Sequence, residues 1–403
     1  MDGANLGGYD QAMAALEPIP RPDPFPLEKI TTAGPPATEA GGTLTIDLAA
    51  VEANWRALSR RVMPAECAAV IKADGYGCGI EPVAAMLAKA GCKTFFVADL
   101  FEARRVRVAT AEPAIYVLNG LLPGTASTFA DLNARPVIGS LVELAEWDAF
   151  VSASNWRGGA ALHVDTGMNR LGISAGEAAA IASRIRSENH GITLLLSHLS
   201  CAELPEHPLN DKQIKLFREV RALYRGIPAS LANSSGIFLG SAAHCDMVRP
   251  GAALFGVNPT PGRNNPMRAV IELRARVVQL RSVQRGDTVG YDAGWTAKRA
   301  TRLAIVAVGY ADGYLRAASA SDAVAGADAI VAGKRCTLAG RVSMDLLAID
   351  VSDLPDGAVK RGDMATLIGN EITVDELAAT AGTIGYEVLT SLGRRYHRVY
   401  RVS

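Results

Sequence analysis

The sequence predicts an α/β protein in which a (β/α)8 TIM barrel is followed by a mostly β C-terminal domain and preceded by a disordered Pro-rich extension. Three observations lead to this prediction. The chain has 403 residues, of which 49% are apolar, and this is enough for two or three domains. Short apolar runs alternate with amphipathic segments as far as about residue 267. Beyond that point helical segments almost vanish, and Gly/Asp turns separate short apolar runs.

Residues 1–42 are expected to form a disordered extension. Seven of the 20 prolines lie here, and five of them occupy alternate positions from Pro18 to Pro26. Such a segment favours extended polyproline conformations and offers no apolar face to bury. A plain tail is favoured over a docking segment for a proline-recognising partner.

Residues 43–267 are predicted to form the barrel, a fold that usually takes roughly 250 residues. A first helix is expected at 48–62. Buried parallel strands are expected at 67–73, 94–98, 114–118, 136–139, 160–164, 192–197, 229–232 and 247–249. Helices are expected between them at 81–90, 102–109, 141–151, 177–188 and 209–224. An open doubly wound sheet would fit the same strand count.

Residues 268–403 are predicted to form the separate, mostly β domain. Strands are expected at 274–280, 303–308, 329–331, 346–351 and 364–368. One helix is expected at 374–381, with a possible continuation over 386–392. The segment has a usual domain size.

Composition excludes several functional classes. The 41 basic and 41 acidic residues give a formal net charge of zero, so the chain has no field that would attract nucleic acid or a membrane surface. No transmembrane segment and no secretory signal are recognised, so a cytoplasmic location is expected. The cysteines and histidines have no metal-ligand spacing, and no metal site is predicted.

Mostly polar residues gather where the predicted barrel strands end, which is where such barrels hold their active sites. These residues are Lys72 and Tyr76, then Asp165, Met168 and Arg170, then His198, Asn233, Ser234 and Arg249. Lys72 is the informative one, because a buried ammonium needs a partner or a lowered pKa. Taken alone, Lys72 fits two interpretations equally well: a member of an ion pair, or an amine that binds an aldehyde. Ser234 and the amides around Gly251 could bind phosphate, and together these features suggest pyridoxal 5'-phosphate.

The motif VIKADGYGCG (70–79) resembles the cofactor-lysine motif of alanine racemases, the fold-type III pyridoxal-phosphate enzymes. Eight further segments are similar to that family in the same order: HVDTGMNRLGI, SHLSCAE, LANSSG, VRPGAALFG, VGYDAGWTA, VGYADGY, GRVSMD and IGYEVLTSLGRR. The resemblance covers about residues 43–403. It implies interconversion of L- and D-alanine, with D-alanine serving peptidoglycan synthesis.

The resemblance implies two catalytic bases on opposite faces of the substrate. Lys72 matches the base that also binds the cofactor covalently. Tyr291 matches the second base, which in the family enters the active site of the neighbouring subunit. A homodimer with shared active sites is therefore expected.

Other matched positions are implied to bind cofactor or substrate. Arg249 matches the arginine that faces the pyridine nitrogen, and His198 matches the histidine that links this arginine to the catalytic tyrosine. Arg170 matches the arginine that contacts the cofactor's phenolic oxygen and the substrate carboxylate. The remaining cofactor positions are Tyr76, Asn233, Ser234, Gly251, Ala252 and Tyr386, and the remaining substrate positions are Met344 and Asp345.

His163 departs from the family pattern. Many members have a lysine here, which becomes carbamylated and orients the arginine that matches Arg170. Because histidine forms no such stable carbamate, chloride or a nearby carboxylate would have to take over that role. The lysine motif also reads Asp74, Gly75 and Cys78 at positions where Asn or Asp, Ala and His are common in the family.

Three other functions compete with alanine racemisation. A racemase of broader specificity is one alternative, although such relatives are often exported. A related decarboxylase family would be expected to carry an acidic residue in place of Arg249. A non-catalytic, single-barrel cofactor-binding protein would lack the second domain and Tyr291.

Overall fold

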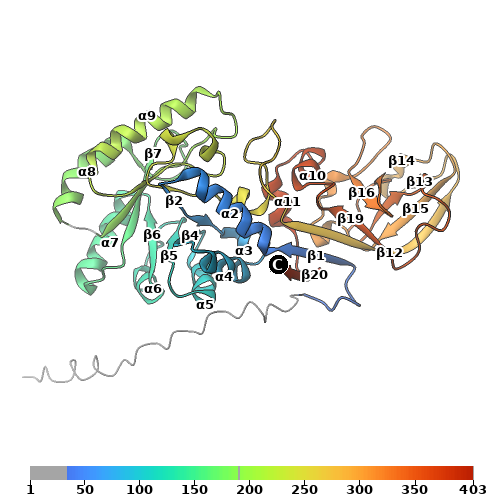
Figure 1. Ribbon diagram of the computed structural model, residues 1–403, viewed down its shortest axis with the longest axis horizontal. Coiled ribbons are helices and arrows are strands. Elements are labelled where there is room, and N and C mark those ends of the chain that lie inside the picture. Colours follow the sequence, from blue (N-terminus) through green and yellow to red (C-terminus); the bar gives the residue numbers. More distant parts are fainter. Residues whose placement is uncertain (1–33, 189–190, 403) are drawn as a thin grey trace, which may run out of the picture.

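The computed structural model describes residues 34–188 and 191–402, and it has two lobes, a barrel and an elongated β domain (Figure 1). The barrel strands are β2 (Glu66–Cys67), β3 (Ala69–Val70), β4 (Thr94–Val97), β5 (Ala114–Val117), β6 (Ala134–Ile138), β7 (Ala160–Asp165), β9 (Ile192–Leu196), β10 (Ala229–Ser230) and β11 (Met247–Val248).

The barrel sheet is closed. Its strand order is β2-β11-β10-β9-β7-β6-β5-β4-β3, with β8 (Ile173–Ser174) beside β7. Only Ala68 separates β2 from β3, and its N–H donates to the Val248 carbonyl at 3.0 Å. β2 and β3 are therefore two halves of one strand, and they join the two ends of the sheet. The predicted barrel is confirmed, and the open sheet is excluded.

Helices surround this sheet (Figure 1). They are α2 (Leu48–Val62), α3 (Lys72–Tyr76), α4 (Ile80–Ala90), α5 (Leu100–Ala109), α6 (Ala126–Asp131), α7 (Leu141–Ser154), α8 (Ala175–Glu188) and α9 (Pro208–Leu223). α2 buries Val51, Trp55, Leu58 and Val62, which lie on one face of a helix because they are three or four residues apart. α6 was not predicted.

The first predicted strand is too long at its C-terminal end. The strand stops at Val70, and residues Lys72–Tyr76 form the tight turn α3 instead. Consecutive residues from Ala73 to Gly77 have positive φ, between 52° and 77°, which is incompatible with a strand.

The C-terminal domain is built on a second sheet with the strand order β17-β16-β19-β12-β1-β20, in which β15 pairs with β12 and β18. Its strands are β1 (Gly42–Asp47), β12 (Ile271–Val283), β15 (Thr301–Val306), β16 (Asp328–Val331), β17 (Lys334–Thr337), β18 (Leu347–Asp350), β19 (Met364–Ile368) and β20 (His397–Arg401). A hairpin of β13 (Thr288–Val289) and β14 (Trp295–Thr296) and two helices, α10 (Val374–Thr380) and α11 (Gly385–Ser391), complete the domain. All five predicted strands and the predicted helix are present.

The structure differs from the prediction in two ways near residue 42: in the domain to which residues 43–47 belong, and in the extent of the N-terminal tail. Residues 43–47, assigned to the barrel, lie in the C-terminal sheet, antiparallel to β12 and parallel to β20. The alternation that fully buries Leu44 and Ile46 explains this pairing. Within the predicted tail, Arg276 donates to the Ala37 carbonyl at 2.9 Å, so residues 34–42 pack on the C-terminal domain. The rest of the predicted tail, residues 1–33, lies outside the described residues.

The chain therefore crosses between the lobes twice, and the two crossings lie side by side. The Asp47 N–H donates to the Val270 carbonyl at 2.8 Å. Asn54 of α2 also holds the second crossing, because its side chain donates to the Arg268 carbonyl at 3.0 Å and accepts from the Arg268 N–H at 2.8 Å. In the described ranges no helix has the length and apolarity needed to cross a membrane, and no group of acidic, histidine or cysteine side chains could hold a metal ion.

Candidate active site

A cavity of about 810 Å³ lies at the C-terminal ends of the barrel strands, and residues from α11 complete its lining. All the barrel residues predicted to bind the cofactor contribute to this cavity, together with Tyr386 of α11. They are Lys72, Tyr76, Arg170, His198, Asn233, Ser234, Arg249, Gly251 and Ala252. The volume is within the range of small-molecule sites.

Lys72 begins the left-handed turn directly after the first barrel strand. Burial and the charge of Arg170 lower its pKa, and Glu102 partly opposes this effect. No carboxylate in the described part of the chain lies within ion-pairing distance of Lys72. The ion-pair interpretation of Lys72 is therefore wrong for these residues, and the lowered pKa makes the neutral, nucleophilic form of the amine easier to reach.

Arg249 is a buried cation without a carboxylate partner in the described ranges. Its guanidinium donates to Ser230 Oγ and to the Ser197 carbonyl, both at 2.6 Å, and lies 3.3 Å from His198 Nδ1. Burial lowers the pKa of Arg249 to about 10, so the side chain stays protonated at neutral pH.

The Arg249 contact also fixes the protonation state of His198. Because a guanidinium can only donate, Nδ1 of His198 accepts, and the ring proton of the neutral form is on Nε2. Burial and the positive charge of Arg249 lower the pKa of His198 to about 3. His198 is thus a neutral side chain whose Nε2–H remains available as a donor.

Arg170 follows a tightly bonded loop after β7. Asp165 Oδ1 accepts from the N–H groups of Gly167 and Met168 at 2.8 and 2.9 Å, which fixes the path of the chain toward Arg170. The Arg170 side chain makes no ion pair within residues 34–188 and 191–402. Burial, Arg249 and Arg170 lower the pKa of neighbouring His163 to about 4, so His163 is neutral and supplies no negative charge to Arg170.

A corner that we name the anion-binding corner, because it could hold a phosphate, lies where β11 leads into the short helix η4 (Ala252–Phe255). Ser234 Oγ accepts from the Gly251 and Ala253 N–H groups at 3.0 and 3.2 Å. Its own hydroxyl proton has no acceptor in the described part of the protein, although Ser234 is 4% exposed. This free donor in a cavity that also contains Lys72 and Arg249 fits a phosphorylated, aldehyde-bearing cofactor such as pyridoxal 5'-phosphate.

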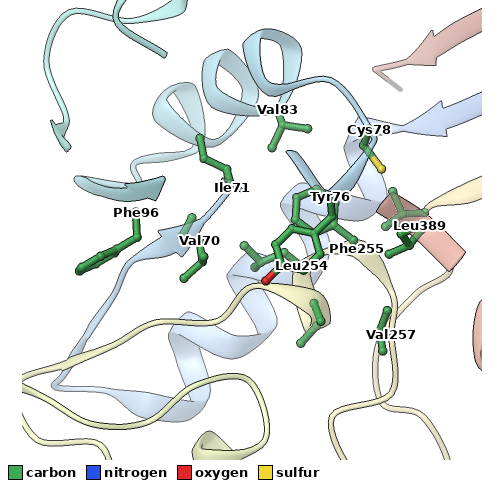
Figure 2. Packing of buried hydrophobic residues seen from close by; sticks show 14 of the residues in the cluster. Val70, Ile71, Tyr76, Cys78, Val83, Phe96, Leu254, Phe255, Val257 and Leu389 are labelled. Carbon is green, nitrogen blue, oxygen red and sulfur yellow. The ribbon is translucent and has the colours of Figure 1, made fainter. Parts of the chain in front are cut away.

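Tyr76 forms the other wall of this corner. Its ring stacks on Phe255 with the centroids 4.9 Å apart (Figure 2). A Cβ atom at Gly251 would lie 2.3 Å from the Tyr76 hydroxyl, so only glycine allows this approach. The tyrosine and the anion-binding corner are therefore packed as one unit.

Tyr386 closes the cavity from the C-terminal domain. Its hydroxyl donates to Glu203 Oε1 at 2.8 Å, and its ring centroid lies 6.3 Å from that of Tyr76. Burial and the Glu203 charge raise the pKa of Tyr386, which keeps this tyrosine protonated.

Tyr291, Met344 and Asp345 are absent from the lining of this cavity. Tyr291 is 67% exposed and Met344 is 53% exposed on the C-terminal domain. Asp345 accepts from both terminal nitrogens of Arg395 at 2.9 Å. The chain's own cavity therefore contains only one of the two bases that the resemblance implies.

Sequence reasoning missed several residues at the cavity. Leu118 and Asn119 line it, and Glu203 bonds Tyr386. Leu118 and Asn119 could have been found, because they directly follow an apolar strand at the end where the other site residues lie. Glu203 lies in a polar loop with no pattern that would point to Tyr386.

Two family models match the chain: alanine racemase, N-terminal domain, over residues 46–259, and alanine racemase, C-terminal domain, over residues 270–400. The chain belongs to the alanine racemase family. The alanine racemase of Methylobacterium sp. (strain 4-46) is 52% identical over 360 residues, which cover 89% of this chain and 98% of that protein.

Solved alanine racemases have the same two-domain fold. The structure from Bartonella henselae, with covalently bound pyridoxal phosphate, has a TM-score of 0.84 and 37% identity, and the match covers 90% of this chain and 99% of that one. The biosynthetic alanine racemase of Pseudomonas aeruginosa has a TM-score of 0.82 and 36% identity, covering 90% and 100%. The family resemblance inferred from the motifs is confirmed.

Proposed function

We propose that this chain is a pyridoxal-phosphate-dependent isomerase that interconverts L- and D-alanine. The cavity supports this proposal because it combines Lys72, whose pKa is lowered, with the buried Arg249 and with Ser234, whose hydroxyl proton is free to donate. Lys72 would hold pyridoxal 5'-phosphate through the cofactor's aldehyde until the substrate amine takes its place, which frees the Lys72 amine. The cofactor would then withdraw electrons from the amino acid and so acidify its α-proton.

Each residue of the anion-binding corner has a defined task in holding the cofactor. Ser234 and Tyr76, which line the cavity with Gly251 and Ala252, would present hydroxyl groups to the phosphate. Tyr386 covers the same region from α11, and Asn233 lies next to Ser234 on the cavity wall. These groups would keep the reactive end of the cofactor next to Lys72.

Arg249 would face the pyridine nitrogen and donate a hydrogen bond to it. Because a guanidinium gives up its proton only at high pH, the ring nitrogen would receive a hydrogen bond rather than a proton. With Arg249 in this role, the ring would be a weaker electron sink than a protonated one, and return of the α-proton would be favoured over side reactions such as transamination.

Two bases would move the proton. Lys72 Nζ would serve one face of the substrate Cα, and the hydroxyl of Tyr291 of the partner subunit would serve the other. The exposure of Tyr291 supports this assignment, since a base that completes another chain's site cannot be buried in its own. The free Nε2–H of His198 would donate to that tyrosine and increase the acidity of its hydroxyl.

The substrate carboxylate would bind between the two subunits. Arg170 is available for it, because the side chain has no ion pair in the described residues. Met344, through its backbone amide, and Asp345 would border the same group from the partner subunit. We place the homodimer in the cytoplasm, where its D-alanine would serve peptidoglycan synthesis.

The decisive test is D-alanine formation by protein stripped of its cofactor, with and without added pyridoxal 5'-phosphate. We expect turnover only with the cofactor, and none for Lys72→Ala under either condition. L-serine and L-lysine are tested in parallel. Turnover of either at a rate comparable with alanine would replace the narrow assignment by a broad-specificity racemase, and absence of all turnover would overturn the proposal.

A further inference from the structure

Arg398 of β20 is a buried cation that bridges the two domains. It is 6% exposed and has no carboxylate within ion-pairing distance among the described residues. NH1 donates to the Gly77 carbonyl at 2.6 Å, and NH2 donates to the carbonyls of Leu392 and Gly393 at 3.2 and 3.1 Å. Burial of a guanidinium without a counterion costs several kcal/mol, so these three carbonyls must be held close to it.

Each bonded carbonyl belongs to a segment that carries a cofactor residue. Gly77 ends the left-handed turn that begins at Lys72, and its N–H closes that turn by donating to the Ala73 carbonyl at 2.8 Å. Gly77 also directly follows Tyr76. Leu392 and Gly393 follow α11, the helix that carries Tyr386. One guanidinium therefore joins the Lys72–Tyr76 turn of the barrel to the Tyr386 helix of the other domain.

The segment after Tyr76 closely approaches both α11 and β20 at this point. A Cβ atom at Gly77 would lie 2.3 Å from the Leu389 carbonyl, and one at Gly79 would lie 2.4 Å from the Tyr400 hydroxyl. Figure 2 shows Leu389 of α11 beside Cys78 and Tyr76 of the turn. The turn is thus pressed against α11 and β20, and Arg398 is the polar link across this contact.

We infer that Arg398 is a positioning residue that sets the separation of Tyr76 and Tyr386 and thereby the affinity for the cofactor phosphate. The inference rests on the proposed function, because it assumes that pyridoxal 5'-phosphate binds between these tyrosines. Arg398 lines no part of the cavity, and it reaches the site through its hydrogen bonds to the Gly77 carbonyl and to the carbonyls that follow α11.

Arg107 provides a matched control. It also donates only to carbonyls, with Nε 3.0 Å from that of Leu132 and NH2 2.9 Å from that of Asn133. It lies on α5, and neither it nor its bonded residues line the cavity. A substitution at Arg107 therefore shows what the loss of an arginine bonded to carbonyls does when the Lys72–Tyr76 turn is not involved.

The test compares Arg398→Met, Arg398→Lys and Arg107→Met in the full chain. Equilibrium dialysis measures the Kd for pyridoxal 5'-phosphate, and hydrogen exchange of cofactor-free protein measures protection of the peptide over residues 70–80. For Arg398→Met we expect about tenfold weaker binding, the cost of about one well-formed charged hydrogen bond, and faster exchange in that peptide. Arg398→Lys should fall between Arg398→Met and the wild type. Arg107→Met should keep both values within about twofold of the wild type.

The outcomes separate this inference from the proposed function. Wild-type protein that fails to bind the cofactor refutes the proposed function. Wild-type affinity and protection in a folded Arg398→Met protein overturn the positioning role, and so does an equal loss in Arg107→Met. If Arg398→Met does not fold, Arg398→Lys decides: unchanged Kd and unchanged exchange over residues 70–80 would contradict the inference.

Discussion

At the scale of single residues, two histidines of the site stay neutral because burial lowers their pKa values. His163 and His198 both lie among cations, and burial with the charge of Arg249 lowers their pKa values to about 4 and about 3. Both imidazoles are therefore neutral throughout the physiological range. The positive charge of the cavity includes that of Arg170 and Arg249, which is suited to a phosphate and a carboxylate.

The lowered histidine pKa values predict a specific response to acid. An unfolded histidine takes up a proton near its ordinary pKa of 6.5, whereas folded His163 does so only near 4. The unfolded state thus binds more protons between these values, so the stabilisation is complete above pH 6.5 and is lost as pH falls toward 4. We expect His163→Gln to make this decline shallower, by at most about 1.4 kcal/mol per pH unit, the value for one proton.

Denaturant unfolding of the cofactor-free protein from pH 8 to pH 4 measures this effect. The difference in unfolding free energy between the two proteins at pH 8, where the histidine is neutral in both states, reports the packing and hydrogen bonding that the substitution removes. This difference serves as the reference. Parallel curves for wild type and His163→Gln below pH 6.5 would show that His163 already titrates normally in the folded state.

Tyr291→Phe should affect the two directions of the reaction unequally. If Tyr291 serves only one face of the substrate, its loss removes the base for one enantiomer and leaves Lys72 for the other. We expect exchange of the α-proton with solvent deuterium to slow by at least about 100-fold for L-alanine and far less for D-alanine. NMR of each enantiomer in D2O measures both rates, and equal losses would exclude the two-base assignment.

The residues of the site were predictable to different degrees. Lys72, Arg170, His198 and Arg249 follow apolar runs, so strand ends alone bring them to one rim. Glu203 and Arg398 act through partners that are 183 and 321 residues away in the chain. No local pattern encodes such distant pairs, and only the folded arrangement reveals them.

At the scale of elements, the turn after the first barrel strand is the most constrained segment. Gly77 has a φ of 77° and a backbone carbonyl within 2.3 Å of the position that a Cβ would take. Gly124 has the same φ and nothing within 4 Å of that position. The two glycines therefore have the same left-handed backbone conformation, but only Gly124 has room for a Cβ atom.

Alanine at these two glycines should separate backbone strain from steric conflict. Gly124→Ala should lower the free energy of unfolding by about 1 kcal/mol, the cost of a left-handed L-residue. Gly77→Ala should lower it by clearly more and should also weaken cofactor binding, because the turn must move away from α11. Chemical denaturation and equilibrium dialysis measure the two effects, and equal values for the two variants would show that the turn has room to adjust.

The elements that the sequence predicted are those with long apolar patterns. The barrel strands were found because they are buried on both faces, and the helices because their apolar residues recur every three or four positions. β13, β14 and β17 were missed because they are short and largely polar. β1 was not predicted as a strand, and residues 43–47 were assigned to the barrel, because its pairing with β12 and β20 depends on strands more than 200 residues away that the local pattern cannot identify.

At the scale of the whole molecule, Tyr291 does not line the cavity that contains Lys72, so a second chain would have to supply this tyrosine. We expect the protein to be a dimer in which each site takes Lys72 from one subunit and Tyr291 from the other. Inactive Lys72→Ala and Tyr291→Phe proteins would then complement each other. A mixed dimer has one site with both substitutions and one site with neither.

Unfolding and refolding an equimolar mixture of the two variants tests this arrangement. Random pairing makes half of the dimers mixed, so about a quarter of the wild-type number of sites should be active. Each variant refolded alone is the control. A mixture that remains as inactive as its components would show that both bases come from the same chain.

The position of β1 also has a consequence for the order in which the protein is made. β1 leaves the ribosome before the barrel, but its neighbours β12 and β20 follow only after the barrel has been synthesised. A gene fragment that starts at residue 268 would omit a strand from the middle of its sheet and would leave β20 without a neighbour. Independent expression of the second lobe therefore requires residues 34–47 to be fused back onto it, and translation of the native chain must reach its last strand before that sheet is complete.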